Sequence, residues 1–293
     1  MQHPIIKKTS RLERIFIIAA LIIVGLILSL IVSTITTLAS GNFTEISVLR
    51  IAQISSQIFT FVLPPILYVM LVKEKPIMSL GINKVKIHWL LLGVAMMYAI
   101  LPLNSLFAEW NAGLRLPESM KALEDMMKSM QDAATEVTEK MLNVNNISGL
   151  IINLFMIAGL AALGEELLFR SLLQTSLIKI CKNAHVGIVL TSAIFSFIHF
   201  EFYGFIPRLV LGLILGYMFY FSRSIWVPML MHFLNNGTVV LIYFLNNKGI
   251  TNIDVDTFGQ TNILVLITSI IIMIVLFLLS IKYSDKERTI TTC

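Results

Sequence analysis

Six polar side chains of chemically useful types lie inside otherwise apolar stretches of this sequence. They are Glu165, Glu166, Arg170, His199, His232 and Asn236. Carboxylates and imidazoles can activate water as general bases, and N–H donors can stabilise an oxyanion. Such residues are costly inside a membrane-spanning helix and usually mark a functional site there. A site with a general base and donors for a carbonyl oxygen or an oxyanion is therefore the first interpretation to weigh.

The Glu165-Glu166 pair divides into two roles. Glu166 and Arg170 are four residues apart, so on a helix they can form an ion pair. That pairing would lower the cost of burying both charges. Neighbouring helical residues point about 100° apart, which leaves Glu165 on another face as a candidate base. The alternative is a pair of solvated charges that end a span at the cytoplasmic surface.

The two histidines also have structural alternatives. His232 and Asn236 are four residues apart and share a helix face, so both can direct N–H donors at one carbonyl oxygen or oxyanion. They could instead form an interhelical hydrogen-bond pair. His199, deep in an apolar segment, could simply bind a neighbouring helix.

The elements that must position these residues are membrane-spanning helices. The sequence is 57% hydrophobic and only 13% charged, with a mean hydropathy of +0.85, whereas soluble domains are about 25% charged. We predict an all-α polytopic membrane protein, with one membrane domain over 15–281 and a catalytic core over about 148–245. Eight apolar segments are expected to span, at about 15–38, 49–72, 88–108, 148–178, 184–203, 205–222, 225–245 and 261–281.

Lys and Arg residues orient the predicted bundle. They recur in alternate loops, for example Lys7 and Lys8, then Lys73 and Lys75, which predicts a cytoplasmic N-tail over 1–14 and a cytoplasmic C-tail over 282–293. This asymmetry explains the net charge of +5 without a nucleic-acid partner. The loop 110–147 is net acidic and is expected outside. Its stripe of Met120, Leu123, Met127 and Met130 predicts an amphipathic helix that rests on the bundle or the bilayer surface.

Depth decides whether the polar groups can meet. If the fourth span continues past Arg170 to Lys179, Glu165 lies about 21 Å from that charged end. His199 then lies about 25 Å beyond Lys182, and His232 and Asn236 lie about 14 and 20 Å beyond Arg223. One layer would contain them all. If residues 171–178 formed a surface loop, no site would assemble.

Three motifs in order resemble those of one protein family. Glu165-Glu166-x-x-x-Arg170, Phe195-x-x-x-His199 and His232-x-x-x-Asn236 look like the motifs of the CPBP family, also called the CAAX protease and bacteriocin-processing (Abi) family. The CAAX prenyl endoprotease is a member. The motif region covers about 160–240, and the family core is an eight-helix bundle.

The resemblance implies peptide-bond hydrolysis inside the bilayer. It implies that Glu165 and His199 hold and activate a water, that His232 and Asn236 stabilise the oxyanion, and that Glu166 and Arg170 support them. Members are described both as metal-dependent and as glutamic proteases. The sequence has no His-Glu-x-x-His motif, and a zinc site of Glu165, His199 and His232 would leave only Glu166 or Asn236 as base. We therefore expect no metal cofactor, with zinc as the alternative.

Two other functions are compatible with the same predicted helical bundle. A non-enzymatic bacteriocin-immunity or interaction protein would use the polar residues for helix contacts, and a proton-coupled transporter would use them as a relay. Against a transporter, no inverted repeat or broken helix pair is evident. The expected partner is a membrane-associated peptide or protein substrate. An Ile- and Lys-rich composition suggests the membrane of a bacterial cell.

Overall fold

The computed structural model describes residues 10–292, except residues 43, 73–75 and 256. The predicted cytoplasmic charges Lys7, Lys8, Lys73 and Lys75 lie outside the described residues. Throughout the described part the regular elements are helices, which confirms the all-α class. The α-helices are α1 Arg11–Ser40, α2 Ile46–Ser56, α3 Leu63–Val72, α4 Pro76–Ser79, α5 Ile87–Ala99, α6 Leu101–Ala112, α7 Lys121–Leu142, α8 Ile147–Asn153, α9 Ala161–Glu166, α10 Thr175–Cys181, α11 Ala184–Phe197, α12 Phe205–Ser222, α13 Trp226–Asn247 and α14 Ile263–Thr292.

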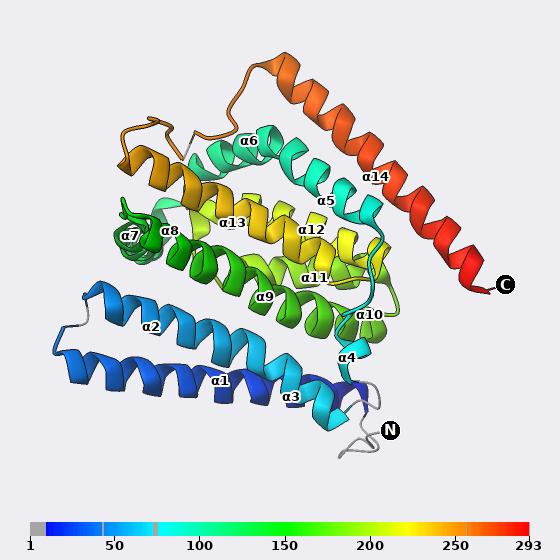
Figure 1. Cartoon of the computed structure of the whole chain (residues 1–293), viewed down its shortest axis with the longest axis horizontal. Coiled ribbons are helices and arrows are strands. Elements are labelled where there is room, and N and C mark those ends of the chain that lie inside the picture. Colours follow the sequence, from blue (N-terminus) through cyan, green and yellow to red (C-terminus); the bar gives the residue numbers. More distant parts are fainter. Residues whose placement is uncertain (1–9, 43, 73–75, 256, 293) are drawn as a thin grey trace.

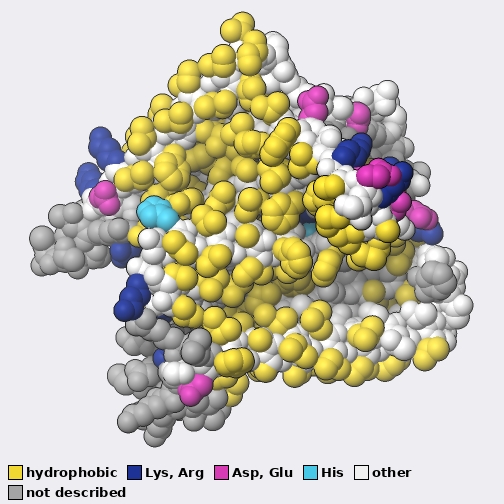
Figure 2. All heavy atoms as spheres, turned by 180° about the vertical axis from the view of Figure 1, so that it is seen from behind, with side chains coloured by type: hydrophobic (Ala, Val, Ile, Leu, Met, Phe, Trp, Pro, Cys, Tyr) yellow, Lys and Arg dark blue, Asp and Glu magenta, His cyan; other side chains and the backbone are white. Residues whose placement is uncertain are grey.

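Helices fill all eight of the predicted apolar segments. Six of them are long and apolar enough to cross a membrane. A seventh, α5 with α6, is bent by 42° where the two helices meet, and the eighth, α11, has only 14 residues. Figure 2 shows apolar side chains covering the middle of the molecule, with charged side chains gathered toward its two ends. Over the residues that the structure describes, the chain is thus a polytopic helical bundle of six or seven long spans and one short apolar helix.

The helices are arranged as a stack of layers (Figure 1). The α1 helix packs against α2 and α3 on one side, and α14 packs against α5, α6 and α12 on the other. Between these layers lie the segment α8–α10 and the helices α11, α12 and α13. In the view of Figure 1 the start of α1 and the end of α14 lie at the same end of the bundle. That end is the one we predict to be cytoplasmic.

The fourth predicted span continues well past Arg170. It forms one 35-residue helical segment over Ile147–Cys181, which confirms the condition on which the depth argument rested. The helix begins where the side chain of Asn146 accepts the main-chain N–H of Gly149, as an N-cap does. It ends at Lys182, which has a left-handed φ of 52°.

Three π-helical segments interrupt the α-helices near the polar residues. They are η1 Gln57–Val62, η3 Leu154–Leu160 and η4 Leu167–Gln174. The first precedes Pro64 and Pro65, which lack N–H groups to donate to the preceding turn. There the Leu63 N–H reaches the carbonyl of Ile58, five residues back. Single π turns of this kind often lie at functional sites.

Close contact between α12 and its neighbours depends on two glycines, as their spacing suggests. A Cβ atom on Gly212 would lie 3.1 Å from Cβ of Ser192, and one on Gly216 would lie 2.8 Å from Oε1 of Gln174. The bare backbone also exposes carbonyls to α8–α10. The Gly212 carbonyl accepts a hydrogen bond from Arg170, and the Gly216 carbonyl accepts one from Gln174.

Several predicted boundaries differ from the structure. The span expected over 184–203 ends at Phe197, so His199 lies just beyond the helix instead of deep within it. The C-tail expected over 282–293 continues α14 as helix to Thr292. Residues 121–142 form the predicted amphipathic helix, α7. Of its expected apolar stripe, Met120, Leu123 and Met130 are exposed and Met127 is half-buried.

Candidate active site

The carboxylate of Glu166, in the buried centre of the bundle, contacts one nitrogen of Arg170 and one nitrogen of His232. Its Oε2 lies 3.1 Å from Nε of Arg170, which confirms the predicted i, i+4 ion pair. Its Oε1 lies 2.8 Å from Nδ1 of His232 on α13. Glu166 is 0% exposed, Arg170 1% and His232 3%. An ionised carboxylate only accepts hydrogen bonds, so Nδ1 of His232 is the donor in this pair.

Arg170 is held by more than its carboxylate. Its Nη2 donates to the Gly212 carbonyl at 3.3 Å, and its guanidinium lies 4.6 Å from the ring centroid of Phe195. The contact with Glu166 is an ion pair without an aligned hydrogen bond, since neither Nε nor Oε2 meets hydrogen-bond geometry. The guanidinium therefore ties three helical segments, η4, α11 and α12, to one buried charge.

Glu165 faces the other nitrogen of the same imidazole. Its Oε2 lies 3.8 Å from Nε2 of His232, which is too long for a direct hydrogen bond. Glu165 itself is 7% exposed. The two neighbouring carboxylates thus reach one ring from different sides, because the imidazole nitrogens lie on different edges. The result is a chain of groups in the order Arg170, Glu166, His232 and Glu165.

His199 lies at the C-terminal end of α11, beside this chain. Its Nδ1 is 2.8 Å from the carbonyl of Phe195, one of the last carbonyls of α11, which lack helical partners. The ring of Phe195 lies 5.2 Å from that of His199 and 6.0 Å from that of His232. His199 is half-buried, and its Nε2 is left to bind another group.

The turn that follows His199 is held from outside the bundle by α7. The hydroxyl of Tyr203 donates to Glu124 at 2.8 Å, and the main-chain N–H of Tyr203 donates to Gln131 at 3.2 Å. Phe200 in this turn has a left-handed φ of 53°, which a bulky residue rarely adopts. The turn and α7 together fix where α11 presents His199.

Asn236 lies one helical turn beyond His232 on α13, as predicted. Its Nδ2 donates to the carbonyl of Ile157 at 3.1 Å, and its Oδ1 accepts from Asn235 at 3.0 Å. Ile157 belongs to the π-helical segment η3. In this state Asn236 joins α13 to η3. The structure thus brings Glu165, Glu166, Arg170 and His232 into one contact chain, with His199 and Asn236 at its sides.

Sequence reasoning missed one residue of this site, Gln57 in η1. Its Nε2 donates to Oε1 of Glu165 at 3.3 Å, and its own Oε1 is buried without a hydrogen-bond partner. Gly164 allows this approach, because a Cβ there would lie 2.9 Å from Cβ of Phe61 and 3.2 Å from Oε1 of Gln57. A buried amide in an apolar span just before a double proline was the signal available in the sequence.

The alternative zinc site does not assemble as a ligand set. Both histidines resemble metal ligands in one respect, since each has its Nδ1 bound to a carboxylate or main-chain oxygen. However, among the residues described, no three His, Cys, Asp or Glu side chains are grouped to hold a metal ion. The combination of Glu165, His199 and His232 therefore does not fit zinc as it stands.

One family model matches the part of the chain that contains the site. Residues 147–238 match type II CAAX prenyl endopeptidase Rce1-like. The match begins at the first residue of α8 and includes all six residues that the motifs singled out. It confirms the resemblance to the CPBP, or CAAX protease, family for this segment. No curated protein and no solved structure matches the chain.

Proposed function

We propose that this CAAX protease relative is an intramembrane endopeptidase that hydrolyses a peptide bond of a membrane-associated peptide or protein. The observation that supports this most is the chain from Arg170 through Glu166 and His232 to Glu165, buried among membrane-spanning helices. A hydrolase needs a general base, and here it can be Glu165. It also needs groups that assist the base, such as an imidazole that a second carboxylate orients. The position of the site among spanning helices means that the scissile bond must enter the bundle.

In the proposed mechanism Glu165 is the general base. A water held between the Glu165 carboxylate and Nε2 of His199 attacks the carbonyl carbon of the scissile bond, and its proton passes to Glu165. The resulting tetrahedral intermediate carries the negative charge on the former carbonyl oxygen. When the C–N bond breaks, Glu165 returns the proton to the leaving amine, so the carboxylate is regenerated.

His232 and Asn236 stabilise the oxyanion in this proposal. The carboxylate of Glu166 accepts the Nδ1 hydrogen of His232 and so orients the ring, with Nε2 on the side of Glu165. In this proposal the ring carries both hydrogens while the oxyanion forms, so Nε2 also acts as an N–H donor. Asn236 has two amide hydrogens, and Ile157 takes one of them. Donors placed in advance in a water-poor site stabilise developing charge strongly. Glu166 and Arg170 are positioning residues that hold the imidazole.

A reconstituted cleavage assay tests the proposal. Two peptides serve as probes: one with a C-terminal tripeptide after a farnesylated Cys, and the same peptide without the lipid. We expect the wild-type chain in liposomes to cut at least one of them and His199→Ala to lose about 100-fold or more in kcat. Cleavage is expected to survive chelators such as EDTA and 1,10-phenanthroline.

The outcomes of this assay separate the alternatives. His185→Ala is a matched control. His185 lies at the start of α11, contacts Tyr217 of α12 and takes no part in the site. If His199→Ala cleaves as fast as His185→Ala, the proposed role of His199 is wrong. Loss of wild-type activity with a chelator and recovery with Zn²⁺ would favour the metal-dependent alternative. Protection of cells against a bacteriocin by inactive variants would favour a non-enzymatic immunity protein.

Gln57 provides a further prediction of this proposal. Gln57→Leu removes the one amide donor shown to Glu165 and keeps the volume of the side chain. We expect kcat to fall about tenfold, since a hydrogen bond to a charged group contributes roughly 1.5 kcal/mol, with KM nearly unchanged. Gln57→Glu should be more harmful, because a second carboxylate would face Glu165. The matched control is Gln53→Leu on the preceding turn of α2. Equal rates for the two leucine variants would exclude a positioning role for Gln57.

A further inference from the structure

The apolar side of the amphipathic helix α7 points away from the protein. Five exposed apolar residues recur at spacings of three and four and so form one stripe, with Met126 in place of the predicted Met127. They are Leu123, Met126, Met130, Ala133 and Val137. Met126 is 54% exposed and Met130 47%. A helix that packs on a soluble core has its apolar stripe on the side of the core, so α7 is turned the other way.

The side of α7 that meets the bundle is largely polar. Its half-buried residues there are Glu124, Met127 and Gln131. The carboxylate of Glu124 accepts the hydroxyl hydrogen of Tyr203, and the side-chain oxygen of Gln131 accepts the main-chain N–H of the same residue. Tyr203 belongs to the turn that follows His199. One side of α7 therefore holds this turn, while the apolar stripe on another side is left uncovered by the described residues.

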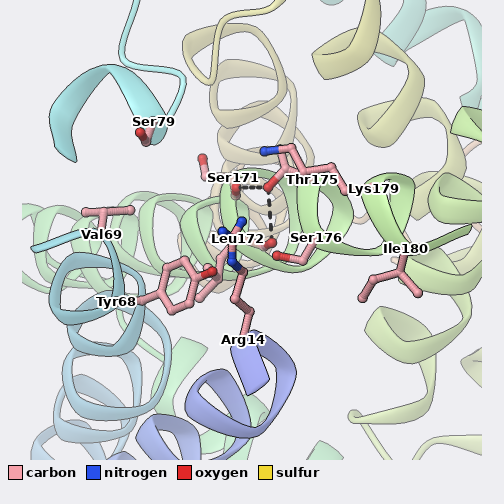
Figure 3. A pocket seen from close by; sticks show the side chains of 10 residues that line it. All are labelled: Arg14, Tyr68, Val69, Ser79, Ser171, Leu172, Thr175, Ser176, Lys179 and Ile180. Carbon is pink, nitrogen blue, oxygen red and sulfur yellow. Dashed lines mark hydrogen bonds between the residues drawn. The ribbon is translucent and has the colours of Figure 1, made fainter. Parts of the chain in front are cut away.

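The helix α7 lies across the end of the bundle that is opposite the start of α1 and the end of α14. Figure 1 shows α7 nearly along its axis, whereas the spanning helices run across the picture. It is joined to membrane-crossing segments on both sides, through α6, which ends at Ala112, and α8, which begins at Ile147. At the other end of the bundle Arg14 and Lys179 line a polar cavity (Figure 3), as expected of a cytoplasmic face. The helix α7 is thus placed at the predicted outer face, across the direction of the spans.

Exposed apolar residues continue from the spans to α7. Trp110, near the end of α6, is 56% exposed, and Ile147 and Ile151 of α8 are 61% and 60% exposed. Tryptophan is typical of the boundary between acyl chains and headgroups, so Trp110 marks the depth at which α6 leaves the bilayer. In Figure 2 the charged side chains at this end of the molecule border a patch of apolar ones. The stripe of α7 therefore adjoins the surface of the bundle that faces lipid.

We propose that α7 binds the outer surface of the bilayer through this stripe, and that this contact holds the turn after His199 in place. An amphipathic helix in this position buries its apolar side at the boundary between headgroups and acyl chains. Acidic residues outnumber basic ones in α7, so attraction to anionic lipids is not the source of binding. The same charge opposes contact between the α7 helices of two copies. The consequence for His199 rests on the proposed function, whereas the contact with lipid does not.

Fluorescence quenching by lipid tests the contact directly. The full-length chain, with Cys181→Ser and Cys293→Ser, receives either Met130→Cys in the stripe or Asp132→Cys on the opposite side of α7, and a bimane label on that cysteine. The vesicles are phosphatidylcholine with a nitroxide near the top of the acyl chain. We expect about threefold stronger quenching for Met130→Cys, since the apolar side of an interfacial helix enters this boundary. Equal quenching at the two positions would overturn the proposal, as would cross-linking of two Met130→Cys chains through this residue, which would place a second copy on the stripe.

Hydrogen exchange in phosphatidylcholine nanodiscs tests the link to His199 and leaves both native cysteines in place. Met130→Asp puts a charge in the stripe, and Ser129→Asp puts the same charge on the neighbouring exposed residue outside it. We expect Met130→Asp to speed exchange of the Tyr203 amide about fivefold, the change expected when the hydrogen bond to Gln131 is lost. Ser129→Asp should exchange as the wild-type chain does. Equal exchange in the two variants would overturn the proposal. Neither measurement involves cleavage, so both decide the matter even if the proposed function is wrong.

Discussion

Glu165→Gln is expected to lower kcat of peptide cleavage about 1,000-fold, in line with the loss of a general base. The amide has nearly the same shape as the carboxylate and can still contact Gln57, but it cannot take a proton from water. KM should change little, because substrate binding does not need the charge. The measurement is kcat and KM in liposomes with the peptide probe that the wild-type chain cuts best.

A matched carboxylate separates loss of the base from a general effect of charge. Glu287 accepts from Trp89 and pairs with Lys86, so Glu287→Gln removes a hydrogen-bonded carboxylate that takes no part in the site. It should retain full activity. Activity of Glu165→Gln within a factor of three of Glu287→Gln would contradict the assignment of Glu165. The folded state of both variants is checked by their Tm in detergent.

Arg170→Met is expected to produce the largest loss of stability. It leaves the Glu166 carboxylate buried without its cation, which typically costs 3–5 kcal/mol. We expect the Tm in detergent to fall by about 10 °C. The double variant Arg170→Met with Glu166→Gln removes both charges and should recover much of that loss. Its activity should stay low, because His232 then lacks the carboxylate that orients it.

An exposed ion pair provides the comparison for this effect. Arg115 lies 3.9 Å from Glu124, and its side chain is 66% exposed. Arg115→Met should therefore cost less than about 1 kcal/mol. If Arg170→Met unfolds at the same temperature as Arg115→Met, the buried pair does not stabilise the bundle. If the double variant is no more stable than Arg170→Met, the loss comes from packing around the guanidinium and not from the unpaired carboxylate.

Much of this structure follows from simple patterns in the sequence. Long apolar runs are enough to locate helices, because a spanning chain must satisfy its backbone within each helix. Spacing of four residues predicts the pair of Glu166 with Arg170, since both belong to one helix. The continuation of the fourth span to Lys179 is a requirement of the predicted site, because only then do the polar groups lie at similar depths. The first two of these inferences depend on local sequence alone.

Other features depend on contacts between distant segments. Gln57 reaches Glu165 only because Gly164 admits η1, and the distance between the two residues along the chain hides that contact. His199 was expected inside a helix, since apolar composition continues past Phe197. The helix ends earlier because the His199 side chain itself takes the Phe195 carbonyl. The bend between α5 and α6 likewise comes at Pro102 in the second position of α6, within a run whose hydropathy shows no break.

The π-helical segments have a consequence for how this chain is compared with relatives. A π turn contains one residue more than an α turn. Adding or removing that residue therefore changes the direction in which the side chains on either side of the turn point. Segments η3 and η4 flank the Glu165-Glu166 pair on both sides. A relative that lacked one residue in either segment could keep every motif and still rotate its carboxylates away from the partner helices. Matching motif residues in an alignment is therefore not enough to show that a relative has the same site. The number of residues between the motifs must match as well.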